Sequence, residues 1–368
     1  MISAQVEIQL IAVLVSIACA LLGVFLVLRK MALISDAISH SILPGVVIGF
    51  FITQDLNSPL LIILAAAAGM LTVLLVEWIQ QTNLVKEDTA IGIVFPALFA
   101  IGIIMIAKNA GDVHLDVDAV LLGELAFAPF NRWMINGTDL GPKGAWEMGI
   151  ILLIVVAAIY LFYKELKVSS FDAGLATTLG FSPVVIHYGL MFLSSVTVVG
   201  AFDAVGAVLV VGFMIVPASV AYLWTDKLIN MIWIAVSVEI VSSISGYWLA
   251  HVLDASISGS IMAMMGIFFT IAYLFSPEQG RFIQKYRRAQ KRQEISLLTL
   301  LIHLQSHEEA SEKSVEHLQE HINWSSEKAK NILKLAQKKE FVEIKKGVIY
   351  ITPQGIQFNK NKTESYLV

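Results

Sequence analysis

Residues 7–28, EIQLIAVLVSIACALLGVFLVL, decide the fold class, because they form one long and almost entirely apolar run. A membrane-spanning helix needs about 20 consecutive, mostly apolar residues. Membrane β-strands are shorter, at about 10 residues, and alternate in polarity. Similar runs follow along the chain, and the predicted spans are 7–28, 37–53, 59–80, 89–107, 146–163, 184–202, 205–224, 228–250 and 258–276. The sequence therefore predicts an all-α polytopic membrane protein with about eight or nine spans.

The composition supports this fold class. The 368 residues are 57% hydrophobic and 15% charged, with a mean hydropathy of +0.75. Soluble domains are about 45–50% apolar and about 25% charged, so a soluble enzyme, a disordered chain and a fibrous protein are disfavoured. Charge divides the chain in two: residues 1–277 hold 9 Lys+Arg and 18 Asp+Glu, a net of −9, whereas residues 278–368 hold 16 and 11, a net of +5.

The absence of several motifs narrows the range of possible functions. The one cysteine, Cys19, allows no intramolecular disulfide and no cysteine-based zinc site, and its apolar surroundings predict an inert packing residue. The sequence holds no G-x-x-x-x-G-K-[ST], G-x-S-x-G or H-E-x-x-H motif. We therefore expect neither an enzyme nor a permanently bound cofactor, and no nucleotide binding through a P-loop.

Basic residues at the ends of the spans predict the orientation. Glu7 stands where a signal peptide would be basic, and Arg29 and Lys30 follow the first span directly. The positive-inside rule then places the N-terminus outside and residues 29–30 in the cytoplasm. The basic tail from Arg281 onward falls in the cytoplasm as well, in a multi-pass protein of the plasma membrane.

Two polar segments interrupt the spans. Residues 108–145 are predicted to form an outer loop with a short re-entrant or surface helix near 119–123. The acidity of this loop would attract cations, although a simply solvated loop explains it as well; the residues concerned are His114, Asp116, Asp118 and Glu124. Residues 164–183 are predicted to form an amphipathic cytoplasmic helix that docks a partner, with a plain connecting loop as the alternative.

The tail reads as a small soluble domain. Helical apolar spacing covers Ile295–Gln305, Ser311 can cap a helix through Ile322, and Ser325 or Ser326 can cap another over Lys328–Lys339. The stretch 341–351 alternates around a Lys-Gly turn and predicts a β-hairpin. This order predicts a winged helix. Its lysines form either a phosphate-binding surface or a solvated helix face; they are Lys328, Lys330, Lys334, Lys338, Lys339, Lys345 and Lys346.

Asp36 and His40 are the first candidate metal ligands. They stand four residues apart, which places both side chains on one face of a helix, roughly 6 Å apart. A carboxylate and an imidazole at this spacing can share a divalent cation. The alternative is structural: Ser35 caps the helix, Asp36 sits at its favourable N-terminus, and His40 bonds a neighbouring helix.

Glu239 is a second candidate, because an ionisable residue near the centre of a span is costly and its segment has no basic residue. Hydrogen bonds from serines at 237, 242 and 243 are the alternative explanation. His251 and Asp254 could ligate transiently or cap a helix, and Asp203 falls at a solvated turn. The tail pairs His303/His307 and His317/His321 could each clip a metal, although exposed histidines are the commoner case.

Three motifs resemble the manganese/zinc/iron ABC-transporter permease family. They are RKMALISDAISHSILPG at 29–45, SFDAGLATTLG at 170–180 and VGAVLVVGFMIVPA at 205–218. The resemblance covers roughly residues 5–277, and GELAFAPF at 123–130 resembles the longer branch of the family. One departure is Asp254-Ala255-Ser256-Ile257-Ser258-Gly259, which lacks the proline that family members often carry there.

The tail resembles the DNA-binding winged helix of diphtheria-toxin-repressor-type metalloregulators. The dimerisation and metal domain of those repressors is missing, which argues against autonomous metal-gated DNA binding. The domain organisation expected is a permease domain at 1–277, a basic linker at 278–291 and a cytoplasmic winged-helix-like domain at 292–368.

The resemblance to the permease family implies partners and site residues. It implies a second permease chain, two cytoplasmic ATPase subunits and an extracellular metal-binding protein. It implies Asp36, His40 and, less directly, Glu239 on the path of transported Mn²⁺, Zn²⁺ or Fe²⁺. It implies an ATPase-coupling segment within 164–183 that includes Phe171, Asp172, Leu175, Ala176, Leu179 and Gly180.

Three functions follow as hypotheses. The first is the membrane subunit of an ABC importer for a divalent transition metal. The second is a membrane-anchored regulator in which the winged helix acts on DNA. The third is a proton-coupled secondary transporter with Glu239 as the relay. The coupling-like segment favours the first, because neither an anchor nor a secondary transporter needs one.

Overall fold

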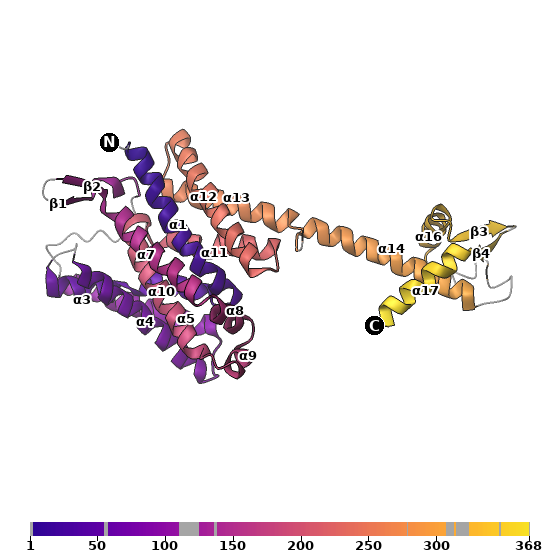
Figure 1. Ribbon diagram of the computed structural model, residues 1–368, viewed down its shortest axis with the longest axis horizontal. Coiled ribbons are helices and arrows are strands. Elements are labelled where there is room, and N and C mark those ends of the chain that lie inside the picture. Colours follow the sequence, from indigo (N-terminus) through magenta and orange to yellow (C-terminus); the bar gives the residue numbers. More distant parts are fainter. Residues whose placement is uncertain are drawn as a thin grey trace. The chain divides into compact units, whose positions relative to one another are not determined.

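The computed structural model describes residues 3–54, 58–109, 125–135, 138–277, 279–306, 313, 324–345 and 347–367. The chain divides into two compact units, Met1–Gly280 and Arg281–Val368, which we call the membrane unit and the tail unit. Figure 1 shows the helical bundle of the first and the small helix-and-hairpin assembly of the second.

The membrane unit is built almost entirely of helices. Its helices are α1 (Ala4–Leu28), α2 (Ala32–Ser41), α3 (Leu43–Thr53), α4 (Pro59–Gln81), α5 (Glu87–Asn109), α7 (Lys143–Leu161), α8 (Tyr163–Phe171), α9 (Ala173–Thr178), α10 (Pro183–Val205), α11 (Ala207–Trp224), α12 (Leu228–Leu253) and α13 (Ile257–Phe275). Within the described residues, nine helical stretches are long and apolar enough to cross a membrane. The predicted polytopic helical fold is confirmed.

The second span differs from its prediction. It begins at Ala32 rather than residue 37, and it consists of two helices, α2 and α3, that meet at Ile42. Pro44 lies in the first turn of α3, where its missing N–H costs no helical hydrogen bond. The break places Asp36 and His40 on a short helix of their own, separate from the apolar α3.

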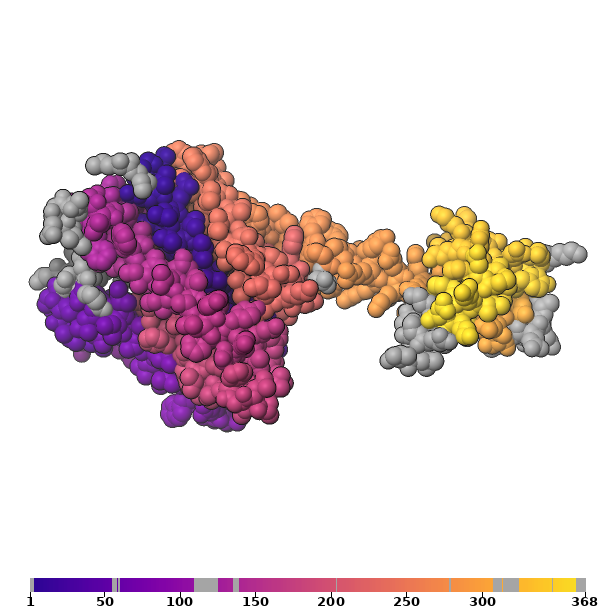
Figure 2. Space-filling model, in the orientation of Figure 1, coloured from indigo at the N-terminus to yellow at the C-terminus, as the bar shows by residue number. Residues whose placement is uncertain are grey.

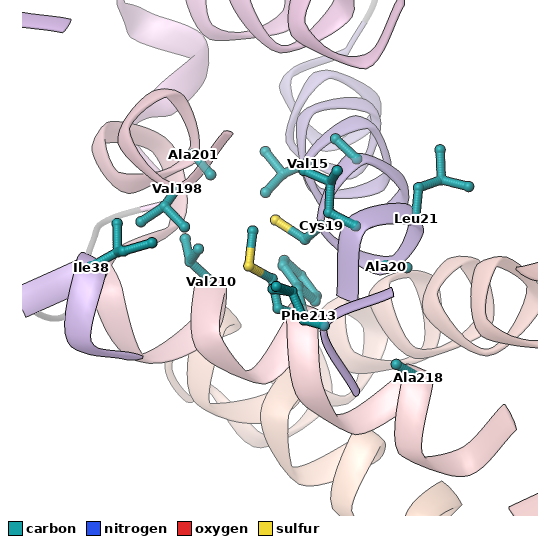
Figure 3. Close-up of a cluster of buried hydrophobic side chains, with 14 of the residues drawn as sticks. Val15, Cys19, Ala20, Leu21, Ile38, Val198, Ala201, Val210, Phe213 and Ala218 are labelled. Atoms are coloured by element: carbon teal, nitrogen blue, oxygen red, sulfur yellow. The ribbon is translucent and has the colours of Figure 1, made fainter. Parts of the chain in front are cut away.

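Helix α1 forms the centre of the membrane unit, where it packs against α7, α10, α11 and α12. The core around it is apolar, and Figure 3 shows the Cys19 sulfur among side chains that include Val15, Val210 and Phe213. The expected burial of Cys19 is confirmed. At Gly23 an added Cβ would lie 1.9 Å from the Met214 carbonyl oxygen, so a glycine is needed for α1 and α11 to approach this closely.

A short hairpin that the sequence did not predict closes one end of the bundle. Strands β1 (Arg132–Ile135) and β2 (Thr138–Pro142) pair antiparallel after the 3-10 turn η1 (Ala128–Phe130). Helices α8 and α9 lie at the other end of the bundle (Figure 1). The re-entrant helix expected near 119–123 lies outside the described residues. So do the candidate cation-attracting residues of this loop, His114, Asp116, Asp118 and Glu124.

The tail unit contains α14 (Arg281–Ser306), α16 (Ser326–Lys338), the antiparallel pair β3 (Val342–Lys345) and β4 (Val348–Ile351), and α17 (Pro353–Leu367). Its core joins the second half of α14 to α16 and the hairpin, through Leu297, Leu300, Leu301, Leu304, Ile332, Leu333, Ala336, Val342 and Ile349. The predicted hairpin and third helix are confirmed, and the helix expected over 311–322 lies outside the described residues. Helix α17 was not predicted.

The basic segment 278–291, expected as a linker, has a different form. From Arg281 it belongs to α14, which continues without a break into the core of the tail unit. Its Arg, Lys, Gln and Ala residues are strong helix formers, so the charge run that resembles a linker is helical.

Candidate functional site

The predicted pair of Asp36 and His40 is present on α2. The His40 Nε2 atom lies 3.4 Å from Asp36 Oδ1, and the two side chains are 26% and 38% exposed. The His40 ring packs beside the rings of Phe95 and Phe99 on α5. A carboxylate and an imidazole are thus held side by side, partly open and against an aromatic wall.

The alternative explanation of this pair expected Ser35 to cap the helix, and this part of it is wrong. Its hydroxyl donates a 2.7 Å hydrogen bond to the Ala32 carbonyl, and the residue preceding α2 is Met31, which makes no side-chain cap. Ser39 donates likewise to the Ser35 carbonyl. The hydroxyls of both serines therefore bond to backbone carbonyls within α2, and the Asp36 carboxylate lies beside His40.

On one chain the pair offers two candidate metal ligands. No three His, Cys, Asp or Glu residues come together as metal ligands within the described parts of the chain. A structural zinc site is closed by four ligands. Two donors on a helix therefore suit a site that is completed from outside, by water or another chain, and that releases its ion readily.

Glu239 lies on α12 and is fully buried, with 0% exposure. Among the described residues, neither carboxylate oxygen has a hydrogen-bond partner, and the nearby Ser242 and Ser243 hydroxyls have none either. Ser237 donates instead to the Trp233 carbonyl. The expectation that these serines satisfy Glu239 is therefore wrong, and the structure does not bring Glu239 into one ligand group with Asp36 and His40.

The predicted coupling residues divide into two kinds. Asp172 caps α9 by accepting a 2.9 Å hydrogen bond from the Leu175 amide, Ala176 is buried, and Gly180 (φ +85°) ends α9. The Phe181 and Gly180 amides donate to the Ala176 and Thr177 carbonyls, in the pattern of a Schellman motif. These three residues shape the segment.

The other three predicted coupling residues are exposed. Phe171, Leu175 and Leu179 are 60%, 50% and 56% exposed. Large exposed apolar side chains outside the candidate spans are candidates for contact with a partner. Figure 2 shows this stretch, in the magenta to pink range, at the surface of the membrane unit.

Arg29 connects α8, within the predicted coupling segment, to the start of α2, a contact that the sequence did not reveal. Its guanidinium donates from Nη2 to Ser169 Oγ at 2.7 Å and from Nε to Ser170 Oγ at 3.1 Å. Partial burial lowers the pKa of Arg29 from its usual value. Arg29 ends α1, and α2 begins three residues later at Ala32, after Lys30 in the left-handed region (φ 63°).

A second contact that sequence reasoning missed joins α4 to α10. Tyr188 donates a 2.6 Å hydrogen bond to Glu77 Oε2, and His187 Nε2 contacts Glu77 Oε1. His187 and Tyr188 lie in the second turn of α10, soon after the coupling segment. The available signal was the carboxylate of Glu77 inside a predicted span.

Arg132 fastens the hairpin to α1. It donates to both carboxylate oxygens of the buried Glu7, at 3.0 and 3.2 Å, and to Asp139 Oδ2 at 2.6 Å. The two carboxylates raise the pKa of Arg132, and the hydrogen bond from Arg132 lowers the pKa of Asp139. The sequence showed Glu7 only as an unusual acid before a span. In the structure its carboxylate is paired with the Arg132 guanidinium.

The remaining candidate metal ligands find less support in the structure. Asp254 is the left-handed C-cap residue of α12, and the His251 ring lies against Trp248. His303 is buried in the tail unit, contrary to the expected exposure, and His307, His317 and His321 lie outside the described residues.

Within the part of the chain that the structure describes, nine candidate spans, with ionisable residues on interior helices and an exposed segment between spans, define the class as a multi-span membrane protein. The chain belongs to the ABC 3 transport family, whose model matches residues 2–276. The predicted family is thereby confirmed for the membrane unit.

Individual relatives agree with this family. The chain is 44% identical over 354 residues to the zinc transport system membrane protein TroD of Treponema pallidum, covering 95% of this chain and 96% of that one. It is 44% identical over 275 residues to the manganese transport system membrane protein MntD of Bacillus subtilis, covering 75% and 93%. The match to TroD therefore extends into the tail unit, whereas the shorter match to MntD cannot cover both units.

A solved structure shows the same fold. PsaBC from Streptococcus pneumoniae, in complex with Fab, matches with a TM-score of 0.63 and 29% identity over 74% of this chain and 92% of that one.

Proposed function

We propose that this chain is the permease subunit of an ABC importer for a divalent transition metal in the bacterial plasma membrane. The observation that carries the proposal is the partly exposed Asp36–His40 pair on a short helix of an ABC 3 transport family member, whose relatives are named for zinc and manganese transport. The ion would pass through this pair rather than reside in it, because a transport site must bind weakly enough to release.

The chemistry of the pair favours borderline metals. Carboxylate and imidazole donors suit Mn²⁺, Fe²⁺ and Zn²⁺, whereas Cu⁺ is selected by sulfur ligands. The names of TroD and MntD give zinc and manganese for those relatives. We therefore place this chain's cargo among zinc, manganese and iron.

A second permease chain would complete the site. The described residues offer two donors at α2 and no third within one ligand group. A two-fold dimer would bring two such pairs to one path and supply four donors. A binding protein outside the cell would deliver the ion to the face that carries the β1–β2 hairpin.

ATPase subunits would dock on the coupling segment in the cytoplasm. Phe171, Leu175 and Leu179 offer the exposed apolar surface for this contact. Arg29 would transmit movement of α8 to the start of α2, because its guanidinium holds Ser169 and Ser170 on one side and its backbone leads to Asp36 and His40 on the other.

The tail unit is proposed to regulate transport or dock a partner. Its own core and the exposed lysines of α16 support a separate binding role. DNA binding by its helix and hairpin is the competing role, which a gel shift with the full chain across a series of salt concentrations would reveal.

Uptake into vesicles tests the proposal. Vesicles holding this chain and its partner ATPase are supplied with Mn²⁺, Zn²⁺ or Fe²⁺, with and without ATP. We expect ATP-dependent accumulation of at least one metal. Accumulation driven by a pH gradient without nucleotide would contradict the proposal and favour a proton-coupled transporter.

A further inference from the structure

The first half of α14, residues 281–295, contributes nothing to the core of its own unit. Burial on this helix begins only at Ser296, and every residue from 285 to 293 is exposed. An isolated helix of this length is marginal in water, because most helical stability comes from packing of one face. Something outside the tail unit is therefore expected to cover this stretch.

The stretch has a basic face and an apolar face. At roughly 100° per residue, its six basic residues fall within an arc of roughly 160°. Four of its five apolar residues fall in the opposite sector of roughly 120°, together with Gln290 and Gln293, whereas Ile295, at the end of the stretch, falls within the basic arc. The basic residues are Arg281, Lys285, Arg287, Arg288, Lys291 and Arg292, and no acidic residue occurs before Glu294. The four apolar residues of the opposite sector are Phe282, Ile283, Tyr286 and Ala289, of which Phe282 is 55% and Tyr286 66% exposed.

The covalent chain keeps this helix close to the membrane. The last candidate span, α13, ends at Phe275, and α14 begins at Arg281. Six residues reach at most about 20 Å even when fully extended. The start of α14 therefore stays within reach of the headgroup layer at which α13 ends.

From these observations we infer that residues 281–295 form a helix lying in the membrane surface and binding anionic phospholipid headgroups. A basic amphipathic helix with aromatic residues on its apolar face lies in the interface between water and lipid. Clustered Lys and Arg next to a span attract anionic lipids. A nucleic acid would also bind the basic face, but it would leave Phe282 and Tyr286 in water.

Spin labels on the two faces of α14 test this inference in the full chain. Ala289→Cys labels the apolar face and Gln284→Cys the basic face, and the wild-type chain is the labelling control, since its Cys19 is fully buried. Each labelled chain is placed in nanodiscs of phosphatidylcholine alone or with phosphatidylglycerol. Collision with oxygen reports lipid contact, and collision with a water-soluble nickel chelate reports solvent contact.

With phosphatidylglycerol we expect the Ala289→Cys label to gain oxygen contact and lose nickel contact, while the Gln284→Cys label stays open to nickel. The difference should vanish when Lys285, Arg288, Lys291 and Arg292 are changed to Gln, and in 1 M salt, where charges are screened beyond about 3 Å. It should survive the matched removal of four charges from α16, by Gln at Lys328, Lys330, Lys334 and Lys338.

Three results would overturn the inference. The first is equal solvent contact of both labels in the anionic nanodiscs. The second is protection of the Ala289→Cys label that depends neither on anionic lipid nor on the four charges, which would show a protein partner. The third is protection that requires added duplex DNA. None of these readouts depends on metal transport, so they stand apart from the proposed function.

Discussion

Asp36 and His40 are two ordinary side chains that we propose serve transport. Their separation of 3.4 Å and their partial exposure leave the pair open to an incoming ion. Glu239 is the opposite case, because burial without a hydrogen-bond partner costs free energy and brings no gain in stability. A residue kept under such a cost is expected to serve function rather than folding.

Replacing Glu239 with a side chain of similar volume separates these two roles. We expect Glu239→Met to raise the free energy of unfolding by about 1 kcal/mol or more, because it removes two unpaired buried oxygens, and to lower metal uptake. Thermal unfolding in detergent and vesicle uptake measure the two effects. Ser237→Ala, on the same helix, is the control. A less stable Glu239→Met chain would show that the carboxyl group has partners and would refute this account of it.

At the scale of elements, the turn between α1 and α2 joins two features that lie far apart in the sequence. Arg29 and Ser169 are separated by 140 residues, yet they share a 2.7 Å hydrogen bond. The motif around 29–45 thus contains both the candidate ligands and the residue that contacts the coupling segment. The loss of one hydrogen bond to a charged group costs roughly 2 kcal/mol, which is enough to weaken the contact between Arg29 and α8.

We expect Arg29→Gln to uncouple the transporter while leaving it assembled. More ATP should be hydrolysed per metal ion imported, by several fold, because α8 would move without α2. The ratio is measured in vesicles with a phosphate-release assay and metal counting. Lys30→Gln removes the neighbouring exposed charge and should keep the wild-type ratio. An unchanged ratio in Arg29→Gln would remove Arg29 from the coupling route.

Some elements could be predicted from sequence and others could not. The spans were predictable because bilayer thickness fixes the length of an apolar run, and the Asp36–His40 contact because helical spacing fixes it. The contacts of Arg29 and Glu77 depend on how distant helices pack, which no local pattern records. The β1–β2 hairpin was missed because its short strands lie in a polar loop. Residues 281–291 resembled a linker because composition shows charge but not helical continuity.

At the scale of the molecule, a membrane unit and a tail unit share one chain. The tail unit has its own core, and the match to TroD covers both units while that to MntD leaves a quarter of the chain unmatched. Transport is therefore expected to need only the membrane unit.

Removing residues 281–368 tests this division. We expect the shortened chain to insert, assemble with its ATPase and import metal at a rate near that of the full chain, but to lose regulation of that rate by metal or partner. Uptake across a series of metal concentrations, for both chains, makes the comparison. Failure of the shortened chain to assemble with the ATPase would refute a purely regulatory tail.

The measurement that bears most directly on the central claim is ATP-dependent metal uptake into vesicles for wild type, His40→Ala, Asp36→Ala and Ser39→Ala. Ser39 lies on the same helix but bonds only the Ser35 carbonyl, so its variant controls for damage to α2. We predict that the His40 and Asp36 variants lose at least about 10-fold in uptake, because loss of even an outer-shell partner costs a metal site 10- to 100-fold, while Ser39→Ala transports normally. Normal uptake by the well-expressed His40→Ala and Asp36→Ala chains would contradict the assignment of the metal path to α2.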